Sequence, residues 1–374
     1  MAIDKHQDRG ALSCGGGRGP HRGRRRALAL AAGLALGTLF AEVAVRVTLD
    51  PHGAALADAR ARLPRWGALL GAGLLEGADD AALQYGLSTG FVAEVEGVTY
   101  RTNSMGMRGR EVEATAPPGT QRMLLVGDSY AYGLGVGELA TLDAQLEELL
   151  QAGQSAPTEV LNLGVPAYHT GQERAWLEAR GFDLAPDLVV LLYFGNDASE
   201  PAYLHDDTRR FLYTDELPLP FAIKRHLWSS ALYVLAAEAS AEAYARSGAF
   251  TAGEGVTWPA VSARLESLFT ACEQRGVPLV VANLPTIRSN ATTADPVAFG
   301  SDLVDAARVS DLCVERGVPV IELGPLLVRE ARAGRLESLL VDPSPGPRYD
   351  DHFTAEGNRL VAEHIAAALA ELMP

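Results

Sequence analysis

The sequence predicts an α/β protein: a three-layer α/β/α domain built on a doubly wound, flavodoxin-like sheet of five parallel strands, preceded by one N-terminal transmembrane helix. Three observations predict this architecture. Short runs rich in β-branched residues are apolar at every position, which is typical of strands buried on both faces. These runs alternate with amphipathic stretches of helical periodicity, as in parallel α/β domains. A long uncharged, apolar stretch follows a strongly basic N-terminus.

We expect several parts along the 374 residues. Residues 1–26 are expected to form a basic cytoplasmic tail, residues 27–48 a transmembrane signal anchor and residues 49–118 a juxtamembrane accessory segment. Residues 119–374 are expected to form the main domain. Residues 198–256 are a long insertion in it, rich in aromatic side chains. This insertion is either a helical cap packed on the domain or a lid that selects the ligand.

The anchor is predicted from charge and hydropathy. Residues 1–26 hold seven Lys or Arg side chains against two Asp, and no charged residue stands between Ala27 and Ala41. The apolar character then continues for about two helical turns, interrupted by Glu42 and Arg46, which can pair on one helical face. About 20 apolar residues cross a bilayer, and a basic flank stays in the cytoplasm. Everything after the anchor is therefore expected in the periplasm or outside the cell.

A cleaved signal peptide is the alternative interpretation, because its basic and apolar regions have the same appearance. Its cleavage site needs small residues at positions −3 and −1. Leu39 or Glu42 would stand at −3 in the two nearest candidate sites. An uncleaved anchor is therefore favoured.

Composition excludes several classes of protein. The formal net charge of −15 argues against a nucleic-acid-binding surface, because phosphates are bound by clustered Lys and Arg. Cys14, Cys272 and Cys313 are too few and too scattered for a disulfide framework or a CxxC metal site. The last two are expected in the core. No His, Asp or Glu spacing suggests a ligand set, so neither a metal nor a cofactor is predicted.

The expected elements follow in chain order. In the accessory segment, residues 54–75 are predicted as helical and residues 91–101 as extended. The five strands of the main domain are expected at Met123–Val126, Val160–Leu163, Leu188–Tyr193, Leu279–Ala282 and Val318–Ile321. Helices are expected at Leu142–Leu150, Gln172–Arg180, Ala260–Arg275, Leu303–Arg316 and Ala355–Leu372.

Chemically capable residues follow the first three of these strands. Ser129 follows the first strand, Gly164 ends the second, and Asn196 follows the third. In doubly wound sheets the reactive loops lie past the carboxyl ends of the strands, so these residues are expected to meet there. A serine on a tight turn between strand and helix presents its hydroxyl above the sheet. The backbone N–H groups of Ser129 and Gly164 and the Asn196 amide could donate to an oxyanion.

A histidine near the C-terminus supplies a candidate base. His352 follows Asp350 and Asp351 directly and precedes the predicted last helix, which Thr354 could cap. A carboxylate beside a histidine can fix the imidazole tautomer and stabilise its cation. His169, in the loop after Gly164, is the rival base and a possible substrate contact.

The chain resembles the SGNH/GDSL hydrolases in four blocks that occur in the family's order: Gly127-Asp128-Ser129, Gly164, Gly195-Asn196-Asp197 and Asp350-Asp351-His352. The resemblance covers residues 119–374. Upstream, Tyr100-Arg-Thr-Asn-Ser-Met-Gly-Met-Arg108 resembles a segment of membrane-anchored bacterial members. The resemblance implies Ser129 as nucleophile, His352 as base, and Ser129, Gly164 and Asn196 as the oxyanion hole. Asp128 and Asp197 are expected to hold their loops through hydrogen bonds to backbone N–H groups.

The acid of the triad has alternative assignments. The commonest family spacing, Asp-x-x-His, would place Tyr349 at the acid position, whereas the Asp-x-His spacing of other members selects Asp350. Asp351 is the second choice, and the family also tolerates a Ser-His dyad. The resemblance favours Asp350.

The predicted function is hydrolysis of acyl esters, chiefly O-acetyl esters of envelope or exported carbohydrate, through an acyl-enzyme. Two alternatives are open. A periplasmic O-acyltransferase would use the same residues with a multi-span partner that carries acyl groups across the membrane. A non-catalytic polysaccharide-binding or assembly protein could also use this scaffold, although binding does not require the set Ser129, Asn196 and His352.

Overall fold

A computed structural model describes residues 21–48, 69, 72–78, 80, 82–83, 85–153, 156–195, 230–233, 257–285, 287–289, 297–299, 302–341 and 352–372. The chain divides into two compact units, residues 1–55 and residues 56–374. The predicted insertion at 198–256 lies outside the described residues except for positions 230–233. Cys14 and most of the helix predicted at 54–75 also lie outside them.

The first unit contains one long helix, α1 (His21–Thr48). Its segment Leu28–Thr48 has a mean hydropathy of 2.0, and within the described part of the chain it alone is long and apolar enough to cross a membrane. Those 21 residues extend about 31 Å as a helix, which matches the roughly 30 Å of a hydrocarbon core. The predicted pair is present, since Arg46 Nε donates to Glu42 Oε1 at 2.7 Å.

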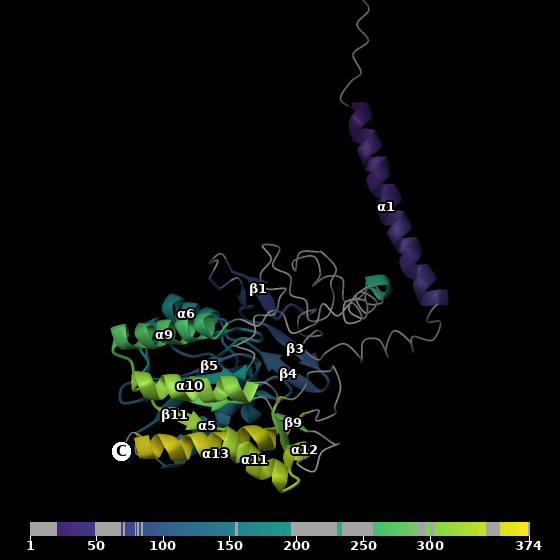
Figure 1. The fold of residues 1–374 in the computed structure, drawn as a ribbon. Coiled ribbons are helices and arrows are strands. Elements are labelled where there is room, and N and C mark those ends of the chain that lie inside the picture. Colours follow the sequence, from purple (N-terminus) through teal and green to yellow (C-terminus); the bar gives the residue numbers. More distant parts are fainter. Residues whose placement is uncertain are drawn as a thin grey trace, which may run out of the picture. The chain divides into compact units, whose positions relative to one another are not determined.

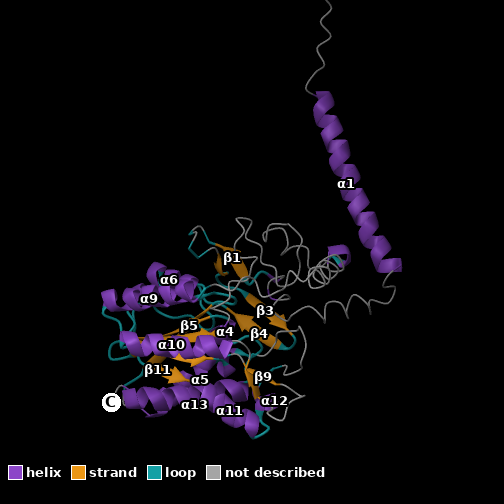
Figure 2. Ribbon diagram, viewed as in Figure 1, coloured by secondary structure: helices purple, strands orange, loops and turns teal. Residues whose placement is uncertain are grey.

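The second unit is built on a five-stranded sheet in the order β11-β8-β7-β5-β6. All neighbouring pairs are parallel, which confirms the predicted doubly wound, flavodoxin-like order. Figure 2 shows the sheet between two layers of helices. Its strands are β5 (Gln121–Gly127), β6 (Thr158–Gly164), β7 (Leu188–Phe194), β8 (Leu279–Leu284) and β11 (Val320–Glu322).

Each strand sends alternate side chains to opposite faces, and each face has its own core. In β5, Leu124 and Val126 pack with helices α6, α9 and α10, whereas Met123 and Leu125 pack with α5, α11 and α13. Figure 1 shows these two helical layers. The helices are α5 (Leu142–Gly153), α6 (Thr170–Ala179), α9 (Trp258–Arg275), α10 (Asp302–Arg316), α11 (Gly324–Arg332), α12 (Leu336–Leu339) and α13 (Ala355–Leu372).

Helices α9 and α10 each carry one cysteine in the core. Cys272 is 1% exposed and Cys313 is fully buried, and both are free thiols. Burial raises the pKa of each thiol to about 12, which keeps them protonated and unreactive. Their predicted role as small core residues is confirmed.

The accessory segment forms two small antiparallel sheets. Strand β1 (Leu75–Gly77) pairs with β2 (Tyr85–Leu87), and β3 (Val92–Val95) pairs with β4 (Val98–Arg101). The single extended stretch predicted at 91–101 is thus a hairpin, because Glu96 and Gly97 both take positive φ angles in its two-residue turn. Leu75 lies in β1 rather than in the predicted helix.

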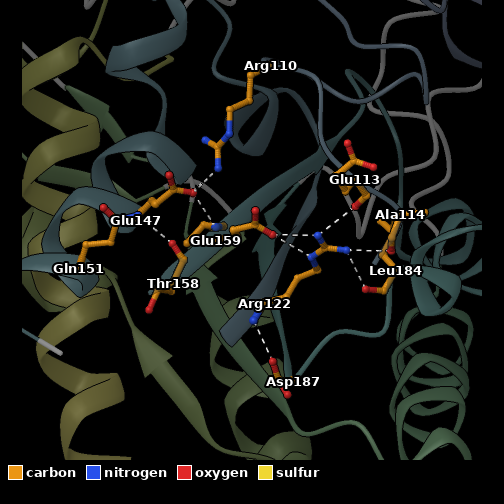
Figure 3. Close-up of polar contacts among 11 residues, drawn as sticks. Arg110, Glu113, Ala114, Arg122, Glu147, Gln151, Thr158, Glu159, Leu184 and Asp187 are labelled. Atoms are coloured by element: carbon orange, nitrogen blue, oxygen red, sulfur yellow. Dashed lines mark hydrogen bonds and ion pairs between the residues drawn. The ribbon is translucent and has the colours of Figure 1, made fainter. Parts of the chain in front are cut away.

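A buried cation fastens the end of the accessory segment to the sheet. The guanidinium of Arg122, in β5, is fully buried and donates to Glu159 Oε2 at 2.8 and 3.1 Å. It also donates to three backbone carbonyl groups, those of Glu113, Ala114 and Leu184, at 2.9, 2.9 and 3.0 Å. Figure 3 shows this cluster near the amino end of β5. The cluster joins the accessory segment to the edge opposite the predicted site.

The remaining described elements are short. Strands β9 (Ile287–Ser289) and β10 (Val297–Phe299) form an antiparallel pair. The 3-10 helices are η1 (Glu138–Ala140) and η2 (Gly181–Leu184), and α4 (Ser129–Tyr132) is a single turn directly after β5.

Candidate active site

Ser129 is presented by a tight turn between β5 and α4. Asp128 caps α4, because its Oδ1 accepts from Tyr130 N at 2.9 Å, as predicted for this carboxylate. The helix ends after one turn at Gly133, which has a φ of 76° and lies against the Thr141 side chain. A Cβ at Gly133 would collide with Thr141. The sequence therefore folds here into a rigid elbow with a half-buried Ser129 at its start.

His352 meets Ser129 across 223 residues of sequence. Its Nε2 lies 2.8 Å from Ser129 Oγ, and the residue is 8% exposed. Its carbonyl accepts from Val341 N at 2.8 Å, and the Tyr130 ring packs against the imidazole with centroids 4.8 Å apart. Thr354 Oγ1 accepts from Gly357 N at 3.1 Å, so the predicted cap of α13 holds the chain next to His352.

Several predicted site residues cannot be placed. Asn196 and Asp197 lie outside the described residues, and so do both candidate acids, Asp350 and Asp351. Asn196 directly follows Gly195, which ends the segment of β7, and Asp351 directly precedes His352, which begins that of α13. Their roles therefore stay predictions.

The N–H of Gly164 is engaged within the fold. It donates to Asn162 Oδ1 at 2.9 Å, and its place in the oxyanion hole stays a prediction. A Cβ at this position would collide with the backbone of Ala131 and Tyr132 in α4. Strand β6 packs directly against the nucleophile turn at Gly164, and only a residue without a Cβ allows so close an approach.

The loop after β6 offers another donor. Val165 N donates to Gly127 O and Tyr168 N donates to Val165 O, each at 3.1 Å. Pro166 has no N–H, and the described part of the chain holds no acceptor for the N–H of Ala167. Ala167 also has a φ of 65°. This left-handed conformation is strained for a residue with a Cβ, and such strain concentrates at functional sites.

His169 is the N-cap of α6. Its Nδ1 accepts from Gly171 N at 3.0 Å. Gln172 Oε1 accepts from the backbone N–H of His169, which completes a reciprocal capping box. Because Nδ1 is engaged in this cap, His169 is not available as a base through that atom. Its contact with substrate stays a prediction.

We expect His169→Ala to lower the free energy of unfolding by about 1 kcal/mol, because it removes the cap. His169→Asn should keep most of that stability, since an Asn side chain also accepts at an N-cap. Urea unfolding of both variants measures the difference. Equal loss in both variants would contradict the capping role, and loss of turnover in a stable His169→Asn variant would identify a substrate contact.

Behind the elbow lies a polar group that the sequence did not indicate. Asn162 Nδ2 donates to Ala131 O at 2.7 Å and to Asp143 Oδ1 at 2.6 Å. Burial raises the pKa of Asp143 to about 6, against the lowering effects of its hydrogen bonds and of the charge on Arg108. Within the described residues, no group of three or more His, Cys, Asp or Glu side chains could hold a metal ion.

A serine hydroxyl within hydrogen-bond reach of an imidazole, at the carboxyl ends of a doubly wound sheet, is the arrangement found in serine hydrolases. The model of the GDSL-like lipase/acylhydrolase family matches residues 125–360. The chain belongs to this family and is an SGNH/GDSL-type hydrolase that acts on esters.

Similar solved structures are distant in sequence. A lipolytic protein of the G-D-S-L family from Desulfitobacterium hafniense is 15% identical, with a TM-score of 0.41, over 67% of this chain and 99% of that one. A lipase/acylhydrolase from Enterococcus faecalis is 17% identical, with a TM-score of 0.41, over 67% and 96%. A catalytic mutant of an acetylxylan esterase from Geobacillus stearothermophilus is 15% identical, with a TM-score of 0.43, over 68% and 94%. No curated protein matches the chain.

Four residues near the site were missed by sequence reasoning: Arg108, Tyr130, Asp143 and Ala167. Arg108 ends the upstream segment that resembles membrane-anchored members, which was the one available signal. Tyr130 is the neighbour of Ser129, but nothing in its type predicts contact with His352. The positive φ angle of Ala167 could not be predicted, because glycine is the residue usually expected in that conformation.

Proposed function

We propose that the protein is a membrane-anchored serine esterase that removes acyl groups, chiefly O-acetyl groups, from carbohydrate of the cell envelope or from exported polysaccharide. The observation that carries the proposal is the 2.8 Å separation of Ser129 Oγ and His352 Nε2. A hydroxyl at this distance from a neutral imidazole can lose its proton as it attacks a carbonyl carbon. The family membership supports the same chemistry.

The proposed reaction has two halves. Ser129 Oγ forms a bond to the ester carbonyl carbon while its proton passes to His352 Nε2, and the tetrahedral intermediate then expels the alcohol, which takes that proton. A water molecule next gives a proton to His352 and attacks the acyl-serine, and the second tetrahedral intermediate releases the acid as Ser129 Oγ takes that proton back from His352. His352 must begin with Nε2 unprotonated, so its proton sits on Nδ1. Asp350, or Asp351, is proposed to accept from that Nδ1–H.

The oxyanion of both intermediates needs donors beside Ser129. We assign them to the N–H of Ser129, the N–H of Ala167 in place of Gly164, and the side-chain amide of Asn196. Neither Ser129 N nor Ala167 N has an acceptor in the described part of the chain, which supports this assignment. A complex with a phosphonate on Ser129 should place the phosphonyl oxygen about 2.7–3.1 Å from Ala167 N. An oxygen nearer to Gly164 N would contradict it.

The substrate class rests on location. The apolar stretch Leu28–Thr48 is long enough to span a membrane, and the basic side chains before it favour a cytoplasmic N-terminus. A domain anchored in this way faces the envelope, where acylated glycans are among the esters that it can meet. The anchor and this orientation are part of the proposal.

Acetate release by the full-length protein in detergent tests the proposal. Turnover of a chromogenic acetate ester, an octanoate ester and acetylated glycans should be compared under one condition. We expect acetate from the glycans and faster turnover of acetate than of octanoate. Preference for octanoate would refute the acetyl-glycan substrate, transfer of acetyl to a sugar acceptor would indicate a transferase, and absence of all turnover would refute the esterase.

A further inference from the structure

The accessory segment places a buried cation behind the nucleophile turn. Arg108 is 4% exposed, and its backbone forms an antiparallel bridge with Asn162 on the open side of β6. Its guanidinium Cζ lies 4.5 Å from the ring centroid of Tyr132 and 4.6 Å from that of Tyr100. Both distances are within the range of cation–π attraction. Arg108 therefore connects the accessory segment to α4 itself, because Tyr132 is the last residue of that helix.

The same segment also holds the loop that follows α4. Arg108 Nη2 donates to Val136 O at 2.8 Å, and Tyr100 OH accepts from Gly135 N at 3.0 Å. Tyr132 and both loop contacts lie within eight residues of Ser129 in the chain. The orientation of the elbow thus depends on side chains from outside the doubly wound core.

Asn162 connects the elbow to the Asp143 carboxylate through hydrogen bonds of its side-chain amide. Its amide has one orientation that satisfies every neighbour, with Nδ2 toward the acceptors Ala131 O and Asp143 Oδ1 and the oxygen toward Gly164 N. An ionised Asp143 accepts more strongly than a neutral one. The backbone of Arg108 forms its bridge with Asn162 itself. The accessory segment therefore borders the residue that holds Ala131 O in the elbow.

Arg108 differs from Arg122, which is the other buried arginine among the described residues. Arg122 makes five hydrogen bonds through its guanidinium, as expected of a buried cation that serves stability. Arg108 makes one, and its Nε and Nη1 have no hydrogen-bond partner among the described residues. Burial without such satisfaction is unfavourable for folding. The position of Arg108 is therefore explained better by the geometry and charge that it supplies at the elbow.

We propose that Arg108 is a positioning residue for the reaction at Ser129, acting through the Tyr132 ring and Val136 on one side and through its backbone bridge with Asn162 on the other. The inference rests on the proposed function, because it concerns the alignment of the same nucleophile. Arg108 does not touch the reacting atoms. Its effect is to hold Ser129 Oγ in reach of His352 Nε2.

The test compares Arg108→Met with Arg122→Met in the full-length protein. Both replace a buried arginine that ties the accessory segment to the sheet, but only Arg108 lies at the elbow. We expect kcat of Arg108→Met on a chromogenic acetate ester to fall about 10- to 100-fold with KM within about threefold, since small misplacements of reacting groups cost this much. Arg122→Met should keep at least about half of the wild-type kcat per titrated active site, because its contacts lie away from the reacting atoms.

Two further measurements complete the comparison. Arg108→Lys keeps the charge but not the planar fork, so its kcat should lie between those of wild type and Arg108→Met, and it replaces the Met variant if that variant does not fold. Hydrogen exchange of residues 129–136 should accelerate more than that of the core strands in the Arg108 variants, because the opening is local. In Arg122→Met, which lowers global stability, residues 129–136 should show no acceleration beyond that of the core strands.

The positioning role is refuted if kcat is unchanged in the Arg108 variants, if only KM rises, or if exchange at residues 129–136 accelerates no more than that of the core strands. The exchange measurement does not need turnover. Absence of wild-type turnover would therefore refute the proposed esterase while the role of Arg108 is still decided by exchange.

Discussion

Ser129→Ala is expected to lower kcat for a chromogenic acetate ester by about 10⁶-fold, because loss of the nucleophile of a Ser-His pair has this effect in serine hydrolases. The methyl group leaves the elbow intact, since the cap of α4 uses Asp128 Oδ1 and Tyr130 N rather than the hydroxyl. Thermal unfolding should therefore be unchanged. Steady-state kinetics and a melting curve on the same preparation measure both effects.

The matched control is Ser262→Ala, which removes a hydroxyl whose hydrogen bond to Pro259 O is exposed on α9. It should leave both rate and stability unchanged. His352→Ala should be as inactive as Ser129→Ala, and the double variant no worse than either, because the two groups act as one unit. Retention of more than about 1% of the rate in Ser129→Ala would exclude it as nucleophile, given the expected effect.

The fold was predictable because strands β5, β6, β7 and β8 are buried on both faces at nearly every position. Runs such as that of β7, from Leu188 to Phe194, are apolar at every position. A short run of this kind is typical of a strand that is covered by helices on both faces. The five strands and the helices between them were predicted correctly, with boundaries that differ by a few residues. The hairpin of β3 and β4 was missed because a turn of only two residues, Glu96 and Gly97, separates strands of similar composition.

The site was less predictable, because its residues come from different layers. Ser129 and His352 could be paired in advance because both stand at element ends that the topology brings to one edge. The close packing at Gly164 could not be predicted, since a glycine required for close packing and a glycine that donates to an oxyanion look the same in a sequence. Arg108 contributes through ring contacts and a distant carbonyl, which no spacing rule encodes.

A second large effect is expected at the base of the sheet, where Arg122→Met should lower the free energy of unfolding by about 3 to 5 kcal/mol. The substitution fills the apolar volume but leaves Glu159 without its cation. The carbonyl groups of Glu113, Ala114 and Leu184 also lose their donor. Buried acceptors without donors are unfavourable by an amount comparable to their desolvation. Urea unfolding followed by tryptophan fluorescence gives the difference.

The size of that loss separates a buried cluster from an ordinary ion pair. Arg174, whose pair with Glu178 is exposed on α6, provides the control, and Arg174→Met should change stability by less than about 0.5 kcal/mol. Combining Arg122→Met with Glu159→Leu should restore part of the loss, because the unpaired carboxylate is removed along with the cation. A loss below about 1 kcal/mol in Arg122→Met would mean that water solvates the cluster in solution. The accessory segment would then be held to the sheet chiefly by its apolar contacts, because loss of Arg122 from a cluster without water would lower the free energy of unfolding by more than this.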